Sequence, residues 1–287
     1  MRALNFIKAH NAILLLLLLP TFCLFGMKKD NEVRLKVNQL SLRIVVVTPS
    51  IVRISITENK DFSNKSSLTV IPLDGKINFK EAISGNIIRI STDSLTIELK
   101  KNDGTISFFD KNHKRILEAV KAETAAFTRT EVEGENVFQI RQYFHLTKDE
   151  ALYGLGQYED PVMNYRGHDV LISQANRTDV NPFIVSTNGY GLLWNNYSES
   201  KFHDVAGETY FWSEVADEID YYFVYGPTID DEIAGYRKLT EDAPMFGKWA
   251  YGYWQSKERY QSANELIGVV KEYREREIPL DNIVQDW

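Results

Sequence analysis

The sequence predicts a mainly β protein, an antiparallel β-sandwich followed by the first strand–helix–strand unit of a parallel α/β domain. From residue 40 to residue 226, many short segments alternate apolar and polar residues, and turn signals separate them. Short strands at regular spacing, without a long helical stretch among them, are typical of a sandwich. After Gly247 the pattern changes to strand, helix and strand with short links, which favours a parallel sheet.

The composition supports a folded core and excludes several classes of partner. Hydrophobic residues make up 44% of the chain and aromatic residues 12%. The net charge of −7, with no stripe of Lys and Arg, argues against a nucleic-acid surface. The five histidines have no metal-ligand spacing, and a single cysteine excludes a Cys-rich site. We therefore expect no nucleic-acid partner, no metal and no other cofactor.

The first residues have the pattern of a targeting segment. Arg2 and Lys8 make a cationic start, and an unbroken apolar run covers Ala12–Leu19 and ends at Pro20. This run is too short to span a bilayer, which needs roughly twenty residues. It fits a secretory signal, so we predict a signal segment at 1–27 and export to the periplasm or the cell surface.

The only cysteine, Cys23, lies inside or just after this segment. A lipid anchor on Cys23 would be the chain's one route to a membrane, but Phe22 is bulkier than the residue usual before such a cysteine. Both interpretations stay open. With no second cysteine, the mature chain holds no internal disulfide, and its stability must come from packing.

The predicted sandwich covers 28–227. Its first residues, Lys28–Asn38, are polar and are interpreted as a lead-in. From Val52 to Thr57 the period is two, which predicts a strand with one solvated face. Asp103-Gly104, between "LTIELK" and "TISFF", predicts a hairpin.

A glycine-rich stretch at Tyr153–Gly156 has the first two glycines of a dinucleotide fingerprint. The third position is Glu159, and the flanks are not strand, turn and helix, so that interpretation fails. We predict a tight turn after a strand instead. No Gly-x-Ser-x-Gly sequence occurs, so a serine hydrolase has no support.

A connecting helix and linker are predicted over 228–246. Thr228 is the expected N-cap, with Asp231 at the reciprocal position of a capping box. Ile229, Ile233 and Tyr236 recur at helical spacing and define the expected apolar face.

The last segment, 247–287, is predicted to be a βαβ unit. The aromatic run Trp249–Trp254 is interpreted as a buried strand, Ser262 and Glu265 as a capping box, and Leu280–Trp287 as a second buried strand. Strands that are apolar on both faces need further strands and helices to cover them. We therefore expect this segment to be the opening of a larger domain.

Several motifs resemble one enzyme family. "GYWQSKERY", a helix and then "IPLDNIVQDW" resemble the start of the catalytic (β/α)8 barrel of glycoside hydrolase family 31, which contains α-glucosidases and α-xylosidases. "YGLGQYEDPVMNYRGHDV", "PFIVSTNGYGLLWNN" and "YFVYGPTIDDEIAGYRKLTEDAP" resemble the galactose-mutarotase-like β-sandwich and connecting segment before that barrel. The resemblance covers the second half of the chain well and the first half only by pattern.

This resemblance implies the N-terminal part of an exported retaining α-glycosidase that acts on oligosaccharides with α-linked xylose or glucose. The residues of these motifs favour an α-xylosidase over an α-glucosidase. In the family, both catalytic carboxylates come from later barrel strands, beyond residue 287, so no catalytic residue is assigned and the chain alone is expected to be inactive.

The resemblance also suggests sugar-binding residues. Asp286 ends the second predicted barrel strand, and the active face of such barrels is built at the C-terminal strand ends. In the family, the matching aspartate binds sugar hydroxyls. The alternative interpretation is that Asp286 is a solvated loop residue without a role in binding. Asn176 lies in a polar link, 165–181, that matches a family loop closing the sugar pocket. Trp254 and Trp287 lie at strand ends. Their rings are expected either to stack on the sugar or to fill the interior of the barrel.

Two alternatives from other classes remain open at this stage. One is a non-catalytic carbohydrate-binding β-sandwich protein, and the other is a structural surface protein. Reading the genomic DNA past Trp287, for a continuing or frameshifted frame that encodes the barrel, would distinguish the enzyme from the binding protein.

Overall fold

The computed structural model describes residues 31–73, 75, 77–120 and 126–286. The predicted signal segment at 1–27, with Cys23, and the strand-end Trp287 lie outside the described residues.

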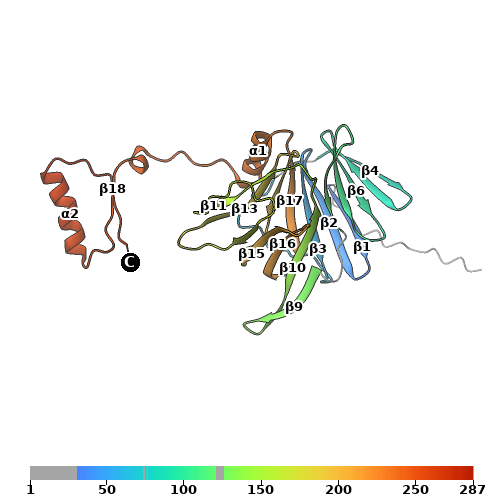
Figure 1. Ribbon diagram of the computed structural model, residues 1–287, viewed down its shortest axis with the longest axis horizontal. Helices are drawn as coiled ribbons and strands as arrows, with labels where there is room; N and C mark the ends of the chain where they lie inside the picture. The colour runs from blue at the N-terminus through green and yellow to red at the C-terminus, as the bar shows by residue number, and fades with distance from the viewer. Residues whose placement is uncertain (1–30, 74, 76, 121–125, 287) are drawn as a thin grey trace, which may run out of the picture.

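Two antiparallel sheets pack face to face and form the sandwich (Figure 1). Among the described residues, the first sheet has seven strands in the order β1-β2-β3-β17-β14-β13-β11. Their bounds are β1 (Glu32–Val37), β2 (Leu40–Thr48), β3 (Ile51–Thr57), β17 (Ile219–Tyr225), β14 (Tyr190–Trp194), β13 (Asp179–Ser186) and β11 (Leu152–Gln157).

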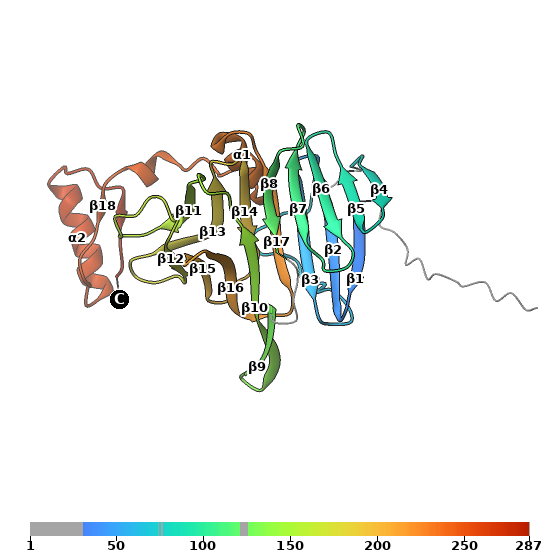
Figure 2. The same cartoon turned by 45° about the vertical axis from the view of Figure 1, so that its right-hand side comes forward.

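In the part of the chain that the structure describes, the second sheet has ten strands, nine of them in the order β12-β15-β16-β10-β8-β7-β6-β5-β4. The remaining strand, β9, pairs with β10, and their hairpin projects beyond the rest of the sandwich (Figure 2). Their bounds are β12 (Asp169–Ile172), β15 (Ser200–Val205), β16 (Glu208–Ala216), β10 (Glu135–His145), β8 (Arg115–Ala119), β7 (Ile106–Asp110), β6 (Leu95–Lys100), β5 (Ile87–Ser91), β4 (Lys80–Ser84) and β9 (Phe127–Val132). The predicted antiparallel sandwich is thus confirmed, as is the hairpin at Asp103-Gly104, which joins β6 to β7.

Aromatic rings from both sheets fill the space between them. The rings of Phe108 and Phe223 stack with centroids 4.0 Å apart. Trp194 stacks on Phe211, at 5.3 Å, and its indole N–H donates to Ser213 Oγ at 2.8 Å. Because each buried aromatic side chain removes about 150–250 Å² from water, these rings are a large part of the folding energy.

Two expectations for the first strands were wrong. The predicted lead-in contains β1, where Val33 and Val37 are buried against β2. In β3 the predicted solvated face is covered, and Ser55 is fully buried. The cover comes from α1 and from a segment that we call the strap, residues 58–73. The strap forms hydrogen bonds with Glu218, just before β17, and with Asn195, just after β14. A period of two identifies a strand, but it does not show what lies over its polar face.

The glycine-rich stretch at Tyr153–Gly156 is part of β11 and not a turn after it. A Cβ at Gly154 would lie 2.4 Å from the carbonyl oxygen of Phe183, and one at Gly156 would lie 2.0 Å from that of Asp179. Both glycines have positive φ, and the register with β13 shifts between them. The glycines therefore allow a bulged edge strand to approach its neighbour closely.

The helix α1 (Ile229–Thr240) begins with the predicted capping box of Thr228 and Asp231. Its buried face matches the prediction only in part, with Ile229 and Tyr236 packed against the core. Ile233 is exposed, whereas Glu232 and Leu239 are fully buried and Tyr236 stacks on Phe183 at 4.6 Å. A helix that lies close against β17 turns a carboxyl group inward, which apolar spacing alone did not indicate.

The tail, which we define as residues 247–286, forms the predicted βαβ unit. It comprises the 3₁₀ helix η2 (Lys248–Tyr251), β18 (Trp254–Gln255), α2 (Ala263–Glu275) and β19 (Asn282–Ile283). β18 and β19 pair in parallel, and Ser262 caps α2 by accepting the N–H of Glu265. Glu265 accepts from Gln261 N–H and not from Ser262, so only half of the expected box forms.

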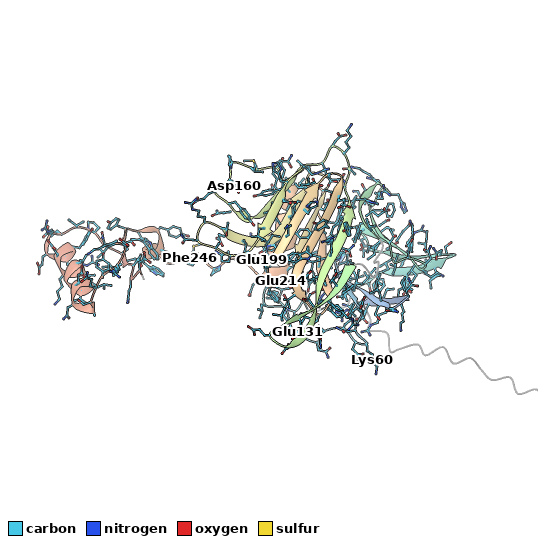
Figure 3. All side chains as sticks on the ribbon, turned by 60° about the horizontal axis from the view of Figure 1, so that its bottom comes forward. Lys60, Glu131, Asp160, Glu199, Glu214 and Phe246 are labelled. Carbon is cyan, nitrogen blue, oxygen red and sulfur yellow. The ribbon has the colours of Figure 1, made fainter. Side chains whose placement is uncertain are left out.

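The strands of the tail are shorter than predicted, at two residues each. Half of Trp249–Trp254 lies in the 3₁₀ helix η2, and Trp249 is 54% exposed. Among the described residues, these two strands pair only with each other, so no neighbouring strand extends or buries them. The tail stands apart from the sandwich, and Phe246 lies in the extended segment that joins them (Figures 1 and 3).

A search of the described helices found none both long and apolar enough to cross a bilayer.

Candidate functional site

The first candidate site is the C-terminal side of the two barrel strands. Asp286 follows the end of β19 by three residues, and its side chain is exposed. This is the strand end at which the sequence analysis expected it. A carboxylate there is free to accept hydrogen bonds from two hydroxyl groups of a ligand.

Trp254 lies in β18 beside this strand end. Its indole N–H donates to the carbonyl oxygen of Ala250 at 3.1 Å, and its ring centroid is 6.3 Å from that of Trp249. The side chain is 49% exposed, so part of the ring faces solvent. This geometry fits a Trp254 ring that stacks on a ligand, and it equally fits a ring that packs against other barrel strands.

A cluster of tyrosines around Gln255 was not predicted from the sequence. Gln255 Oε1 accepts from the hydroxyls of Tyr253 and Tyr273, and its Nε2 donates to the hydroxyl of Tyr260 at 3.3 Å. The hydrogen bond to Tyr253 raises the pKa of Tyr273. These contacts tie the end of β18 to α2. The only signal in the sequence was the placement of Tyr253 and Gln255 on either side of Trp254.

Asn176 lies on the sandwich and not on the tail. It is exposed in a short turn that the Ala175–Thr178 bridge closes, between β12 and β13. The link around it is not one long loop, because it contains β12. No hydrogen bond or ion pair joins the described residues 247–286 to the sandwich, so no such contact connects Asn176 with Asp286.

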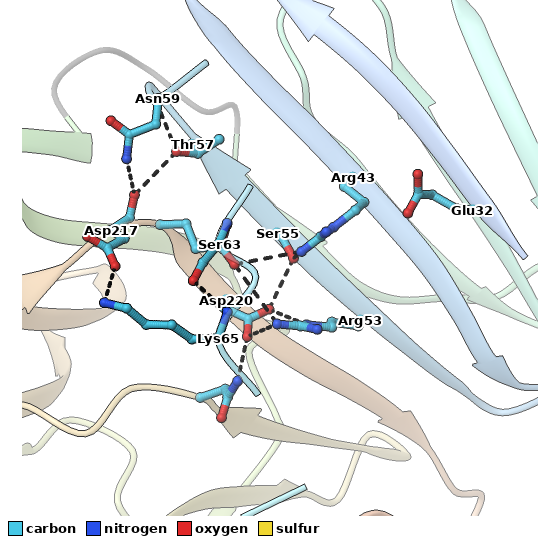
Figure 4. A network of polar contacts seen from close by, with 12 residues as sticks. Glu32, Arg43, Arg53, Ser55, Thr57, Asn59, Ser63, Lys65, Asp217 and Asp220 are labelled. Atoms are coloured by element: carbon cyan, nitrogen blue, oxygen red, sulfur yellow. Dashed lines mark hydrogen bonds and ion pairs between the residues drawn. The ribbon is translucent and has the colours of Figure 1, made fainter. Parts of the chain in front are cut away.

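The second candidate site is a polar cluster on the outer face of the seven-stranded sheet (Figure 4). Arg53 makes a bidentate pair with Asp220, with nitrogen–oxygen distances of 2.7 and 2.8 Å. Ser55 donates to the same carboxylate at 3.1 Å, and Asn195 donates through its amide. Because charged pairs of this geometry are strong and directional, Asp220 holds β3, β14 and β17 in register.

Glu218 lies next to this pair and is only 8% exposed. Its Oε2 accepts the backbone N–H of Ser63 at 3.0 Å. Its Oε1 is 3.7 Å from Arg43 and 3.9 Å from Arg53, distances too long for hydrogen bonds. Burial raises the pKa of Glu218, and the neighbouring Asp220 adds to this effect.

A cavity of about 450 Å³ opens beside the cluster, between the strap and the loops after β14 and β16. Its lining carries hydroxyl, amide and charged groups, among them Ser66, Asn195, Tyr197, Asp217 and Glu218. No sequence pattern indicated this cavity, because its lining comes from distant segments that only the fold joins; Ser63 and Glu218, for example, are 155 positions apart.

A third buried carboxyl group belongs to Glu232 of α1. Its Oε2 accepts the N–H of Ser186 at 3.2 Å, and its Oε1 has no hydrogen-bond partner among the described residues. Burial raises the pKa of Glu232 to about 8, which favours the protonated carboxyl group in the folded protein. Among the described residues, no cluster of three or more His, Cys, Asp or Glu side chains is arranged to bind a metal ion.

This fold defines the class of protein: a galactose-mutarotase-like sandwich joined to the first unit of a (β/α)8 barrel. The sequence matches the glycosyl hydrolase 31 N-terminal galactose mutarotase-like domain over residues 41–203. It also matches the glycosyl hydrolases family 31 TIM-barrel domain over residues 243–287. The chain belongs to glycoside hydrolase family 31, as the motifs predicted.

Curated relatives agree with this assignment. The chain is 39% identical over 264 residues to an α-xylosidase of Saccharolobus solfataricus, an alignment that covers 88% of this chain and 35% of the relative. It is 27% identical over 251 residues to α-glucosidase 2 of Bacillus thermoamyloliquefaciens, covering 82% of this chain and 31% of that enzyme. The chain thus spans about a third of the length of these relatives.

Solved structures give the same fold. A family 31 α-xylosidase from Xanthomonas citri superposes with a TM-score of 0.79 at 25% identity, over 91% of this chain and 45% of that one. A family 31 α-xylosidase from a soil metagenome, complexed with xylose, gives a TM-score of 0.78 at 25% identity, over 91% and 41% of the two chains.

Proposed function

We propose that the chain is the N-terminal part of a retaining α-glycosidase that acts on oligosaccharides with α-linked xylose or glucose. The observation that carries this proposal is the alignment with the Saccharolobus α-xylosidase, because it covers 88% of this chain at 39% identity. Among the relatives reported above, the more similar one is the α-xylosidase, so we favour α-linked xylose as the sugar that is released.

In this proposal Asp286 binds two hydroxyls of the sugar in the cleavage subsite. Its exposed position after β19, on the side where such barrels build their active face, supports the role. Asn176 would contact the sugar from the sandwich through its amide, which both donates and accepts. Trp254 and Trp287 would contribute ring faces at the strand ends.

Retaining hydrolysis needs a nucleophilic carboxylate and an acid/base carboxyl about 5–5.5 Å apart. We assign neither role to a residue of this chain. Asp286 is exposed, and charges in open water interact too weakly to orient a reaction. The 287-residue polypeptide should therefore hydrolyse no α-glycoside, whereas a polypeptide that supplies the later barrel strands should do so.

Export is a separate part of the proposal, and it rests on the cationic start and the apolar run Ala12–Leu19. Mass spectrometry of the mature N-terminus tests it. Cleavage after Pro20 supports export, an acylated Cys23 adds a membrane anchor, and an intact Met1 on a cytoplasmic product contradicts export.

A chimera tests the enzymatic proposal. Residues 28–287 replace the matching N-terminal segment of the Saccharolobus α-xylosidase, and release of nitrophenol from nitrophenyl α-xyloside and α-glucoside is measured. Asp286→Ala should lower kcat/KM about ten- to a hundredfold, since a charged hydrogen bond to a sugar hydroxyl is worth about 1.5–3 kcal/mol.

The matched control is Glu275→Ala, which removes an exposed carboxylate from α2 and should leave kcat/KM unchanged. A folded chimera without activity on either substrate would contradict the proposed function. Wild-type kinetics in the Asp286→Ala chimera would show that this residue is structural. Turnover by the 287-residue chain that copurifies with it would mean that its active site is complete.

A further inference from the structure

The cavity beside Glu218 has the size and the rigidity of a small-molecule site. Its volume of about 450 Å³ lies within the range of ligand pockets, roughly 300–1,000 Å³. The bidentate pair of Arg53 with Asp220 forms part of its wall (Figure 4). The strap is held in place by Ser63, which donates to Glu218, and by Lys65, which pairs with Asp217 at 2.8 Å. A pocket fixed in this way needs little ordering when it binds.

An unused hydrogen-bond acceptor lies in the wall of this cavity. More than nine-tenths of Glu218 is buried, yet its Oε1 accepts no hydrogen bond among the described residues. A carboxylate oxygen that lines a cavity and has no protein donor can accept hydrogen bonds from a ligand, so the site favours a ligand that donates them. The hydroxyl of Ser66 also lines the cavity without a partner among the described residues.

The charge of the lining selects against anions. Arg53 and Lys65 face four carboxylates, those of Glu135, Asp217, Glu218 and Asp220, which leaves the lining with an excess of negative groups. A phosphate or a uronate would be repelled. The remaining groups are hydroxyls and amides, which both donate and accept, and the half-exposed ring of Tyr197 offers an apolar face. A neutral ligand with many hydroxyls and apolar C–H faces matches all of these features.

We propose that this cavity is a second saccharide-binding site, placed on the sandwich and independent of the barrel, in which Glu218 accepts hydrogen bonds from the hydroxyls of a neutral oligosaccharide. The ring of Tyr197 packs against one sugar face, and Ser66 lies at the mouth. The site holds a glycan chain without cleaving it, so the sandwich has a ligand of its own.

Calorimetric titration of the 287-residue chain with maltotriose tests the proposal, with spermidine as a cationic probe of the same cavity. Ser66→Trp fills the cavity from the strap, and its matched control is Leu68→Trp, which places the same ring two residues away on a side chain that is 82% exposed and outside the lining. Glu218→Gln removes the charged acceptor at nearly constant size. Asp286→Ala removes the barrel ligand proposed above.

The wild-type and Leu68→Trp chains should bind maltotriose alike, while Ser66→Trp and Glu218→Gln should weaken binding at least tenfold. Absence of binding at millimolar maltotriose, or equal affinity in Ser66→Trp, would overturn the proposal. Binding that Asp286→Ala abolishes and Ser66→Trp preserves would assign the sugar to the barrel instead. Binding of spermidine in place of maltotriose would make the cavity a cation site. None of these outcomes depends on the activity of the chimera.

Discussion

Trp194 and Trp249 show how differently the two regions of this chain are built. Trp194, in the sandwich, is 1% exposed, stacks on Phe211 and donates its indole N–H to Ser213. Trp249, in the tail, is 54% exposed. Of the described residues 247–286, only Leu280 is buried. The sandwich therefore has a core of its own, whereas the tail has a fold without one.

Local signals nevertheless work equally well in both regions. Thr228 caps α1 in the sandwich, and Ser262 caps α2 in the tail with the same side-chain-to-backbone bond. A helix cap contributes about 1 kcal/mol wherever it lies, but most helical stability comes from packing of an apolar face. The comparison teaches that correct secondary structure does not by itself make a region stable.

The largest expected effect is the difference in stability loss between substitutions of Trp194 and of Trp249. Trp194→Ala should lower the free energy of unfolding by about 3–5 kcal/mol, because it opens a large cavity and leaves Ser213 without its donor. Trp249→Ala should change it by no more than about 0.5 kcal/mol. Urea unfolding followed by circular dichroism measures both. A comparable loss in the two variants would contradict the difference between the regions.

A smaller effect is expected where charges stabilise the sandwich. Asp220→Ala removes the bidentate partner of the largely buried Arg53 and should cost about 3 kcal/mol. Asp217→Ala breaks the exposed pair with Lys65 and should cost less than about 1 kcal/mol. The same urea experiment checks this pair of variants. Equal costs would mean that the cluster is no more important than a surface ion pair.

The pH dependence of stability tests the buried carboxyl of Glu232. Its pKa is raised by burial to about 8 in the folded state from an ordinary value of 4.5. The folded protein therefore binds a proton that the unfolded chain releases, and the free energy of unfolding falls as pH rises from about 4.5 to 8. Glu232→Gln should flatten this decline. Glu214→Gln, an exposed change on β16, is the control and should leave the decline as it was.

The sequence predicted those features that depend on neighbouring residues. The hairpin at Asp103-Gly104, both helix caps and the order of sandwich, helix and βαβ unit follow from local patterns and from the motifs of family 31. The position of Asp286 after a barrel strand was predicted in the same way, and its role in sugar binding stays a prediction.

Features that depend on distant residues were missed or wrong. Ser55 is buried because the strap and α1 cover the outer face of β3. Gly154 and Gly156 serve a close approach to β13, which no spacing reveals. The cavity beside Glu218 combines the strap with strands far along the chain. Trp249–Trp254 has the composition of a buried strand, but burial requires neighbours that the described residues do not provide.

Hydrogen exchange of the purified 287-residue chain, followed by mass spectrometry, tests most directly whether the two regions differ in stability. Peptides from β14 and β17 should exchange only through global unfolding, because their amides lie in a buried sheet. Peptides covering Trp249–Trp254 and 280–286 should exchange far faster in the monomer. Slow exchange in these tail peptides, equal to that of β14 and β17, would contradict the account and show that the tail is stable on its own.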